Sequence, residues 1–333
     1  AGRARRHWRL RLTEAFSPMT TTIQAGTPSG AGLPGGPNLA RRVRPGEAVI
    51  KVILFASALL SIAITIGIVA SLIQPVIEFF GEQISFGDFF STTDPSGSSA
   101  KPAVIPLLTG TLVTTVIALV VAVPIGLGAA MYLSEYASTR ARKWLKPTVE
   151  LLAGVPSIVY GFFAVTFITP VVLKDWLNLP VGFFNMLSAG LVLGVMIIPT
   201  VASLSEDAMS AVPLALRQGS LAMGANRMQT TLRVVFPAAL SGIAAAVVLG
   251  ISRAVGETMI VATAAGNGKN FTLNPFDAAQ TMTGFIATTA RGENPVGSPE
   301  YNMLFAVGLL LFLITLVINA ISITIVRRFR QEY

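Results

Sequence analysis

The chain has 333 residues, of which 53% are hydrophobic and only 12% charged, about half the charged share of an ordinary soluble domain. Its apolar residues fall in long uncharged blocks, which indicates a membrane protein and excludes a soluble enzyme. The formal net charge is +8 at pH 7, and cytoplasmic loops rich in Lys and Arg explain it better than a nucleic-acid partner. With no Cys and a single His, His7, the chain lacks the residues for a disulfide, thiol catalysis or a Cys- or His-based metal site.

Residues 1–46 read as a basic tail. The stretch Gly26–Pro37 is rich in Gly and Pro, which predicts disorder. Met19 is a plausible natural start, and the tail lacks the apolar core and small-residue cleavage site of a cleaved signal peptide. We therefore predict a cytoplasmic tail over 1–46 and a membrane domain over 47–333.

Six apolar windows follow, and each reaches the length of about 20 residues that a helix needs to cross a bilayer. The second and fifth are longer than one span requires, so we expect them to be tilted or interrupted, with a bend at Pro124 in the second. The prediction is an all-α polytopic fold with about six transmembrane helices; a re-entrant pair in place of one span is the alternative. The windows are approximately 52–73, 104–133, 151–173, 184–204, 235–265 and 303–326.

The distribution of Lys and Arg fixes the expected orientation. With the N-terminus inside, 19 of these residues lie on the cytoplasmic side and four on the outside, while Arg253 lies within a span. Cytoplasmic loops carry the excess of positive charge, so both termini are expected in the cytoplasm. The two long outside loops, about Gln74–Ala103 and Gly266–Asn302, could form a docking surface, the second with a short helix at Phe276–Thr289.

The cytoplasmic loop between spans four and five, about residues 205–234, has an unusual pattern. It reads as a helix, a glycine stop at Gly224, a second short helix and Pro237, which opens the next span. Leu214, Leu221 and Met228 recur at seven-residue spacing. An apolar ridge of this kind needs a partner groove or must lie on the membrane, and the pattern alone leaves both readings open.

At these residues the sequence resembles the permease subunits of bacterial ABC importers, whose coupling loop carries Glu-Ala-Ala, three residues, Gly, nine residues and Ile-x-Leu-Pro. Gly224 matches the glycine, and the block ending at Pro237 matches the last four positions conservatively. The Glu-Ala-Ala positions hold Gln-Gly-Ser instead, so the acid is missing. The resemblance implies that the loop presses into a groove on a cytoplasmic ATPase subunit. The residues expected to take part are Arg217, Gln218, Gly219, Ser220, Gly224 and Pro237.

Further segments narrow the resemblance. Residues 252–259 read Ser-Arg-Ala-Val-Gly-Glu-Thr-Met and are followed by Gly266-Asn267, residues 152–161 read Leu-Ala-Gly-Val-Pro-Ser-Ile-Val-Tyr-Gly, and span two begins Leu-Leu-Thr-Gly-Thr-Leu and ends Met-Tyr-Leu-Ser-Glu-Tyr. From about residue 45 to the end, the chain looks like the phosphate permeases of the Pst system, and more like the PstC type than its PstA partner. The resemblance implies the type I ABC importer permease fold and a path for phosphate.

Arg253 and Glu257 are two charged residues in one predicted span, where each costs about 2.5–3.5 kcal/mol on insertion scales. They are four residues apart, so they are expected to share one helix face and can pair. One reading is a structural ion pair that locks two spans together. The other is a pathway site, because a guanidinium matches phosphate oxygens. In the family that the chain resembles, this Arg and Glu are implicated in phosphate transport, which favours the pathway reading.

Thr109 and Thr111 belong to a cluster of hydroxyl side chains near the outer part of span two. We include both as candidates for the substrate pathway. Hydroxyl residues in helices more often bond their own backbone, and that alternative stays open here.

The chain has no G-x-x-x-x-G-K-[ST] motif, so ATP hydrolysis and ATP-Mg binding are expected in a separate subunit, with no cofactor in this chain. The resemblance implies four kinds of partner: a second homologous permease (PstA-like), two ATPase subunits (PstB-like), an extracytoplasmic phosphate-binding protein (PstS-like) and membrane lipid, with no nucleic acid. The nearest rival is a permease for another oxyanion, such as molybdate or sulfate. An ion channel would not need the coupling loop, and an intramembrane enzyme would need a catalytic set that is missing.

Overall fold

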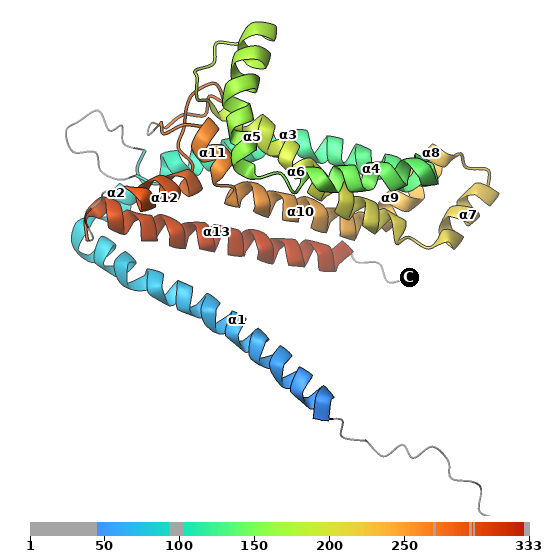
Figure 1. Ribbon diagram of the computed structural model, residues 1–333, viewed down its shortest axis with the longest axis horizontal. Helices are drawn as coiled ribbons and strands as arrows, with labels where there is room; N and C mark the ends of the chain where they lie inside the picture. The colour runs from blue at the N-terminus through green and yellow to red at the C-terminus, as the bar shows by residue number, and fades with distance from the viewer. Residues whose placement is uncertain (1–44, 93–102, 269–270, 293–294, 296, 330–333) are drawn as a thin grey trace, which may run out of the picture. The chain divides into compact units, whose positions relative to one another are not determined.

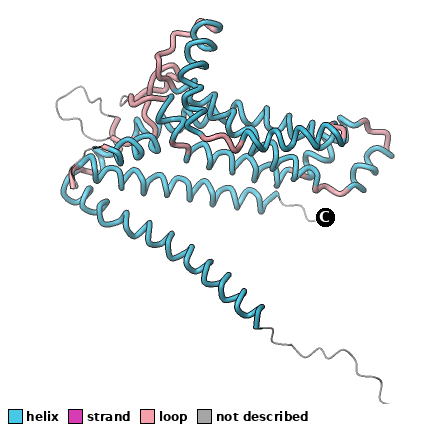
Figure 2. The backbone as a smooth tube through the Cα atoms, viewed as in Figure 1, coloured by secondary structure: helices cyan, strands magenta, loops and turns pink. Residues whose placement is uncertain are grey.

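The computed structural model describes residues 45–92, 103–268, 271–292, 295 and 297–329. Within these ranges the chain is helical, with no strand (Figure 2). The predicted tail lies outside the described residues, except that helix α1 (Pro45–Glu78) begins at its end. The disorder expected at 26–37 therefore stays a prediction.

The chain divides into two units, residues 1–60 and 61–333. The described part of the first unit is the start of α1, whose large apolar side chains from Val49 to Leu60 are exposed. An exposed apolar helix of this kind suits a lipid or protein surface better than water.

The second unit holds the remaining helices, several of which run alongside one another (Figure 1). After α1 come the π-helical segment η1 (Phe79–Gln83), α2 (Phe86–Phe89), α3 (Ile105–Met131), η2 (Tyr132–Tyr136), α4 (Thr139–Leu152), α5 (Ser157–Phe163), η3 (Ala164–Trp176) and α6 (Met186–Ser210). They are followed by α7 (Leu214–Ala222), α8 (Arg227–Thr230), η4 (Thr231–Val235), α9 (Phe236–Ala238), α10 (Leu240–Gly256), α11 (Met259–Ala264), α12 (Met282–Arg291) and α13 (Pro299–Phe329).

Five helical segments of the described chain are long and apolar enough to cross a membrane, and a bent pair adds a sixth if it forms one broken span and not a re-entrant loop. The pair is Arg227–Ala238 with Leu240–Gly256, at an angle of 72°. The predicted all-α class and count of about six spans are confirmed, as is an interruption in the fifth. The single spans are Val49–Gln83, Ile105–Tyr136, Ser157–Trp176, Met186–Ser210 and Pro299–Arg327.

Two predicted helix starts lie well before the observed ones. The third window was expected to begin at Leu151, but α4 ends at Leu152 and the span helix begins at Ser157, because Pro156 has an extended backbone with ψ 132°. The outer short helix was expected from Phe276, but α12 begins at Met282, capped by the Thr281 hydroxyl. In the second place, Asp277 accepts hydrogen bonds from the Thr272 hydroxyl and the Asn274 amide, which hold it in a turn before the helix.

The central packing is between α3 and α6. A Cβ added to Gly190 would lie 2.7 Å from the Ile117 side chain, and one added to Gly194 would lie 2.8 Å from the Ala118 carbonyl oxygen. Small residues that let two backbones approach are how membrane helices associate without a hydrophobic driving force. The buried cluster around Leu193 and Ile197 continues this contact, so α6 is held firmly along its length.

Candidate functional site

Arg253 lies in the last turn of α10, and its side chain is exposed. Its Nη1 donates a hydrogen bond to Thr200 Oγ1 of α6 at 3.1 Å. Among the described residues it forms no ion pair. The guanidinium therefore keeps most of its donors and its charge available, while one neutral hydroxyl fixes its direction.

Glu257 does not share a helix face with Arg253, so that expectation was wrong. Helix α10 ends at Gly256, and Glu257 is extended, with φ −67° and ψ 132°. Its Oε1 accepts hydrogen bonds from the backbone N–H of Met259 at 2.9 Å and of Ile260 at 3.3 Å. The i,i+4 rule holds only on a continuous helix, and here the carboxylate caps the next helix instead.

The break between α10 and α11 is fixed from a third element. The Thr283 hydroxyl in α12 donates to the Glu257 carbonyl oxygen at 2.6 Å, which satisfies a carbonyl that the ended helix leaves without a partner. Gly256 precedes it, and glycine is a poor helix former. Together these residues end α10 one turn beyond Arg253.

Helix α5 packs closely on α11 and brings Tyr160 to the same region. A Cβ added to Gly161 would lie 1.9 Å from Thr263 Oγ1, so only glycine fits there. The Tyr160 hydroxyl donates to the Leu152 carbonyl oxygen at 3.0 Å. Thr200 and Tyr160 were not singled out from the sequence, because a lone hydroxyl in an apolar span carries no distinctive signal.

Thr109 and Thr111 are buried, with hydroxyls turned to the backbone. Thr109 donates to the Ile105 carbonyl oxygen at 2.9 Å and Thr111 to that of Leu107 at 2.8 Å. The Thr111 hydroxyl also accepts from the Met282 N–H at 2.9 Å, which ties α12 to α3. This arrangement matches the backbone-bonding alternative, and a pathway role for either residue stays a prediction.

The loop between α6 and α10 has the helix, glycine and second helix that the sequence predicted. Gly224 has φ +85°, a left-handed conformation that favours glycine. Asn226 and Gln229 then form a capping box that starts α8. The apolar ridge is exposed, with Leu214 67%, Leu221 49% and Met228 63% exposed.

The remaining coupling candidates differ in what they offer a partner. Gln218, Gly219 and Pro237 are exposed. The Ser220 hydroxyl lies 3.0 Å from the Thr230 hydroxyl and so joins α7 to α8. Arg217 forms an ion pair within the chain, with its Nη2 3.0 Å from Glu135 Oε1.

A second polar cluster joins α4 to the end of α6. Glu206 is fully buried and pairs with Arg142 and with Lys146, whose Nζ lies 2.6 Å from Glu206 Oε2 and 2.6 Å from Asp207 Oδ1. Hydrogen bonds to Asp207 and Glu206 raise the pKa of Lys146 above its usual value, although burial opposes the shift. A buried carboxylate needs such partners. The sequence offered no hint of this pairing, which joins residues about 60 positions apart.

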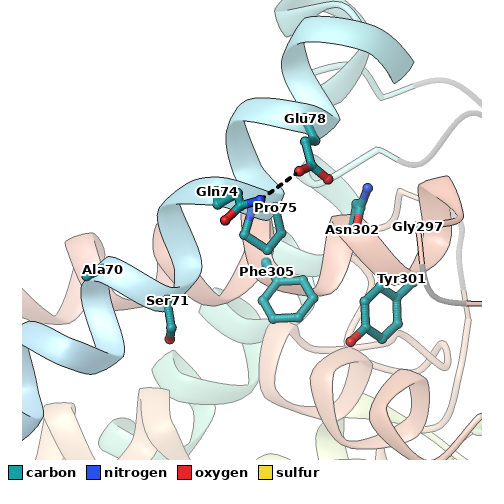
Figure 3. Close-up of a pocket in the computed structure, with 9 residues that line it drawn as sticks. All are labelled: Ala70, Ser71, Gln74, Pro75, Glu78, Gly297, Tyr301, Asn302 and Phe305. Carbon is teal, nitrogen blue, oxygen red and sulfur yellow. Dashed lines mark hydrogen bonds between the residues drawn. The ribbon is translucent and has the colours of Figure 1, made fainter.

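A separate cavity of about 300 Å³ lies between the end of α1 and the start of α13 (Figure 3). Glu78 and Gln74 line one side, joined by a hydrogen bond of 3.2 Å, and Tyr301 and Phe305 line the other. None of the residues predicted for the pathway or the coupling loop lines it.

The family described as binding-protein-dependent transport system inner membrane component matches residues 122–331. The chain belongs to this family. It is therefore a multi-pass protein of the bacterial inner membrane and a transport permease, and its relatives are permeases rather than enzymes.

Individual members of the family resemble the chain over most of its length. It is 37% identical to the probable ABC transporter permease protein YqgH of Bacillus subtilis, over 82% of this chain and 89% of the relative. It is 34% identical to the phosphate transport system permease protein PstC of Haemophilus influenzae, over 83% and 92% of the two chains. The PstC protein of Mesorhizobium japonicum is 31% identical, over 85% and 90%.

Solved structures show the shared fold. A chain of a bacterial alginate ABC transporter, solved in complex with a pentasaccharide-bound periplasmic protein, matches with a TM-score of 0.60 at 17% identity, over 85% of this chain and 96% of that one. A chain of the MetNI methionine ABC transporter matches with a TM-score of 0.52 at 22% identity, over 68% and 94%. This permease thus has the type I ABC importer fold.

Proposed function

We propose that the chain is a transmembrane permease subunit of an ATP-driven phosphate importer. The observation that carries the proposal is Arg253, an exposed guanidinium at the end of an apolar helix, held by Thr200 and unpaired with any described carboxylate. The identity of 31–37% to PstC proteins of several bacteria supports phosphate as the substrate.

Arg253 is a cation in an apolar span and forms no ion pair with the described carboxylates. Placing its charge there costs about 2.5–3.5 kcal/mol on insertion scales, and a carboxylate partner would have offset that cost. Glu257 is close in sequence but serves as a cap for α11. A planar fork of donors left free in this way suits a tetrahedral oxyanion that passes and leaves.

Energy is supplied from outside this chain. The exposed ridge of α7 and the left-handed Gly224 support docking of the loop on a cytoplasmic ATPase subunit, which would bind ATP-Mg and hydrolyse it. The complete importer would comprise this chain, a second homologous permease, two ATPase subunits and an extracytoplasmic phosphate-binding protein, in lipid. This chain would supply the path and break no bond, and it would need no cofactor of its own.

Uptake of radiolabelled phosphate tests the proposal in cells that lack their own permease and receive this chain with its partner subunits. We expect saturable, ATP-dependent uptake. Unlabelled phosphate should inhibit it, and molybdate or sulfate at the same concentration should not. If unlabelled molybdate or sulfate inhibits the uptake strongly and unlabelled phosphate inhibits it only weakly, the substrate is the rival oxyanion. Phosphate uptake in the absence of an ATPase subunit would assign a channel and contradict the proposal.

A further inference from the structure

The guanidinium of Arg217 joins α7 to η2 and to the end of α6. Arg217 in α7 donates through Nη2 to Glu135 Oε1 at 3.0 Å and to the Met209 carbonyl oxygen at 2.7 Å. Its Nη1 donates to the Val212 carbonyl oxygen at 2.9 Å. Glu135 belongs to η2, the continuation of α3, and Met209 lies in the last turn of α6. The loop helix is therefore tied to the ends of two spans.

The Arg217–Glu135 pair is shielded from solvent. The side chains of Arg217 and Glu135 are 16% and 12% exposed, whereas Arg140 and Arg227 are exposed. Pairs on an open surface contribute little, whereas removing one partner of a shielded pair leaves a charge without compensation. The three acceptors also need the planar fork of Arg, which Lys cannot replace.

Apolar packing supports the same contact. Leu216, the neighbour of Arg217, packs against a buried cluster that includes Ala130 of α3, Met209 of α6 and Val235 of η4. One side of α7 thus packs against the ends of α3 and α6. Leu214, Leu221 and Met223 stay exposed and free for a partner.

We propose that the Arg217–Glu135 pair is a strut that makes α7, the end of α3 and the end of α6 move as one body. The proposal rests on the proposed function, because it takes an ATPase subunit as the body that displaces α7. Helix α6 is continuous from Thr200 to Met209, about 13 Å at the rise of an α-helix. A displacement of α7 is therefore transmitted along α6 to the Thr200 hydroxyl, which accepts a hydrogen bond from Arg253. Arg217 and Glu135 are positioning residues in this account and do not touch the substrate.

The strut is tested by a distance measurement in the assembled importer. The chain has no Cys, so spin labels can be placed on Cys introduced at Ala215 of α7 and at Tyr136, which are both exposed. In the otherwise unchanged chain, the distance between the labels is expected to stay the same with and without ATP, because loop and span end move together. In Arg217→Gln and in Glu135→Gln, ATP is expected to shift or broaden that distance.

A second readout measures coupling directly. The phosphate imported per ATP hydrolysed is expected to fall about tenfold or more in either variant, while the ATPase subunits still co-purify. Arg217→Lys should be intermediate, and the exchange Arg217→Glu with Glu135→Arg should recover part of the coupling. Arg140→Gln is the matched control. It removes an exposed charge from α4, the helix that follows η2, and should leave both readouts unchanged.

The outcomes separate the strut from the proposed function. Wild-type coupling and an ATP-insensitive label distance in both Gln variants would overturn the strut. Loss of the ATPase subunits from both would overturn it as well, because the pair would then serve assembly. If the label distances behave as expected but the wild-type complex imports no phosphate, the proposed function fails and the strut stands.

Discussion

Oε1 of Glu257 accepts a hydrogen bond from the backbone N–H of Met259 at 2.9 Å. The carboxylate therefore belongs to the start of α11, although its place in the sequence suggested a partnership with Arg253. The guanidinium is oriented by a neutral group instead, the hydroxyl of Thr200. An anion can compete with a hydroxyl for Arg far more easily than with a carboxylate.

The exchange Arg253→Glu with Glu257→Arg tests whether the two residues are partners. We expect neither assembly nor uptake to be restored beyond the single variants, because Glu257 lies outside α10 and its carboxylate caps α11. Glu257→Ala should lower the stability of the complex by about 1 kcal/mol through loss of the cap, measured by thermal unfolding. Glu257→Gln, which keeps an acceptor oxygen, is the control. Full recovery of uptake by the exchange would show that a direct pair exists after all.

Thr200→Val tests the hydroxyl that holds Arg253. The variant keeps the shape of the side chain and removes the acceptor, so the KM for phosphate uptake should rise roughly threefold to tenfold, as for a hydrogen bond of about 1 kcal/mol. Thr115→Val is the matched control, because the buried Thr115 hydroxyl has no hydrogen-bond partner among the described residues. An unchanged KM for Thr200→Val would remove Thr200 from the site.

Gly224→Val tests the turn in the coupling loop. A β-branched residue at φ +85° costs about 1–2 kcal/mol or more, while the space around the glycine is open. The variant should insert normally but recover several-fold less ATPase subunit in a pull-down. Gly224→Asn, which tolerates this conformation better, should lose less. Gly308→Ala, in α13 and with open space for a Cβ, lies outside the coupling loop and should lose nothing. Normal recovery and transport by Gly224→Val would show that the turn is not needed for docking.

Gly161→Ala tests the contact between α5 and α11. The new Cβ would meet Thr263 Oγ1 at 1.9 Å, and overpacking of this kind typically costs about 1–3 kcal/mol. We expect a lower unfolding temperature of the purified complex, partly recovered when Thr263→Ala is added. Gly128→Ala, where a Cβ has open space, is the control. Equal stability of Gly161→Ala and Gly128→Ala would contradict the close packing.

Hydropathy predicted the spans because membrane insertion selects long apolar helices, and it could not locate the breaks within them. The segment from Leu240 to Ala264 is long and mostly apolar despite Arg253 and Glu257, and one contact that holds the end of α10 comes from Thr283 in a later helix. Gly224 was predictable from local turn chemistry alone. The Arg217–Glu135 pair was not, because its residues lie 82 positions apart and meet only after α3 and α6 have packed.

Uptake by Arg253→Gln tests the central claim most directly. Gln keeps a polar side chain and a donor toward Thr200, but it removes the charge and the planar fork that an oxyanion needs. The measurement is radiolabelled phosphate uptake at matched protein levels, with co-purification of the partner subunits as the control for assembly. We predict that uptake is abolished or nearly so while the complex still assembles, and that Arg253→Lys is intermediate. Wild-type uptake by Arg253→Gln would contradict the assignment of Arg253 to the anion pathway.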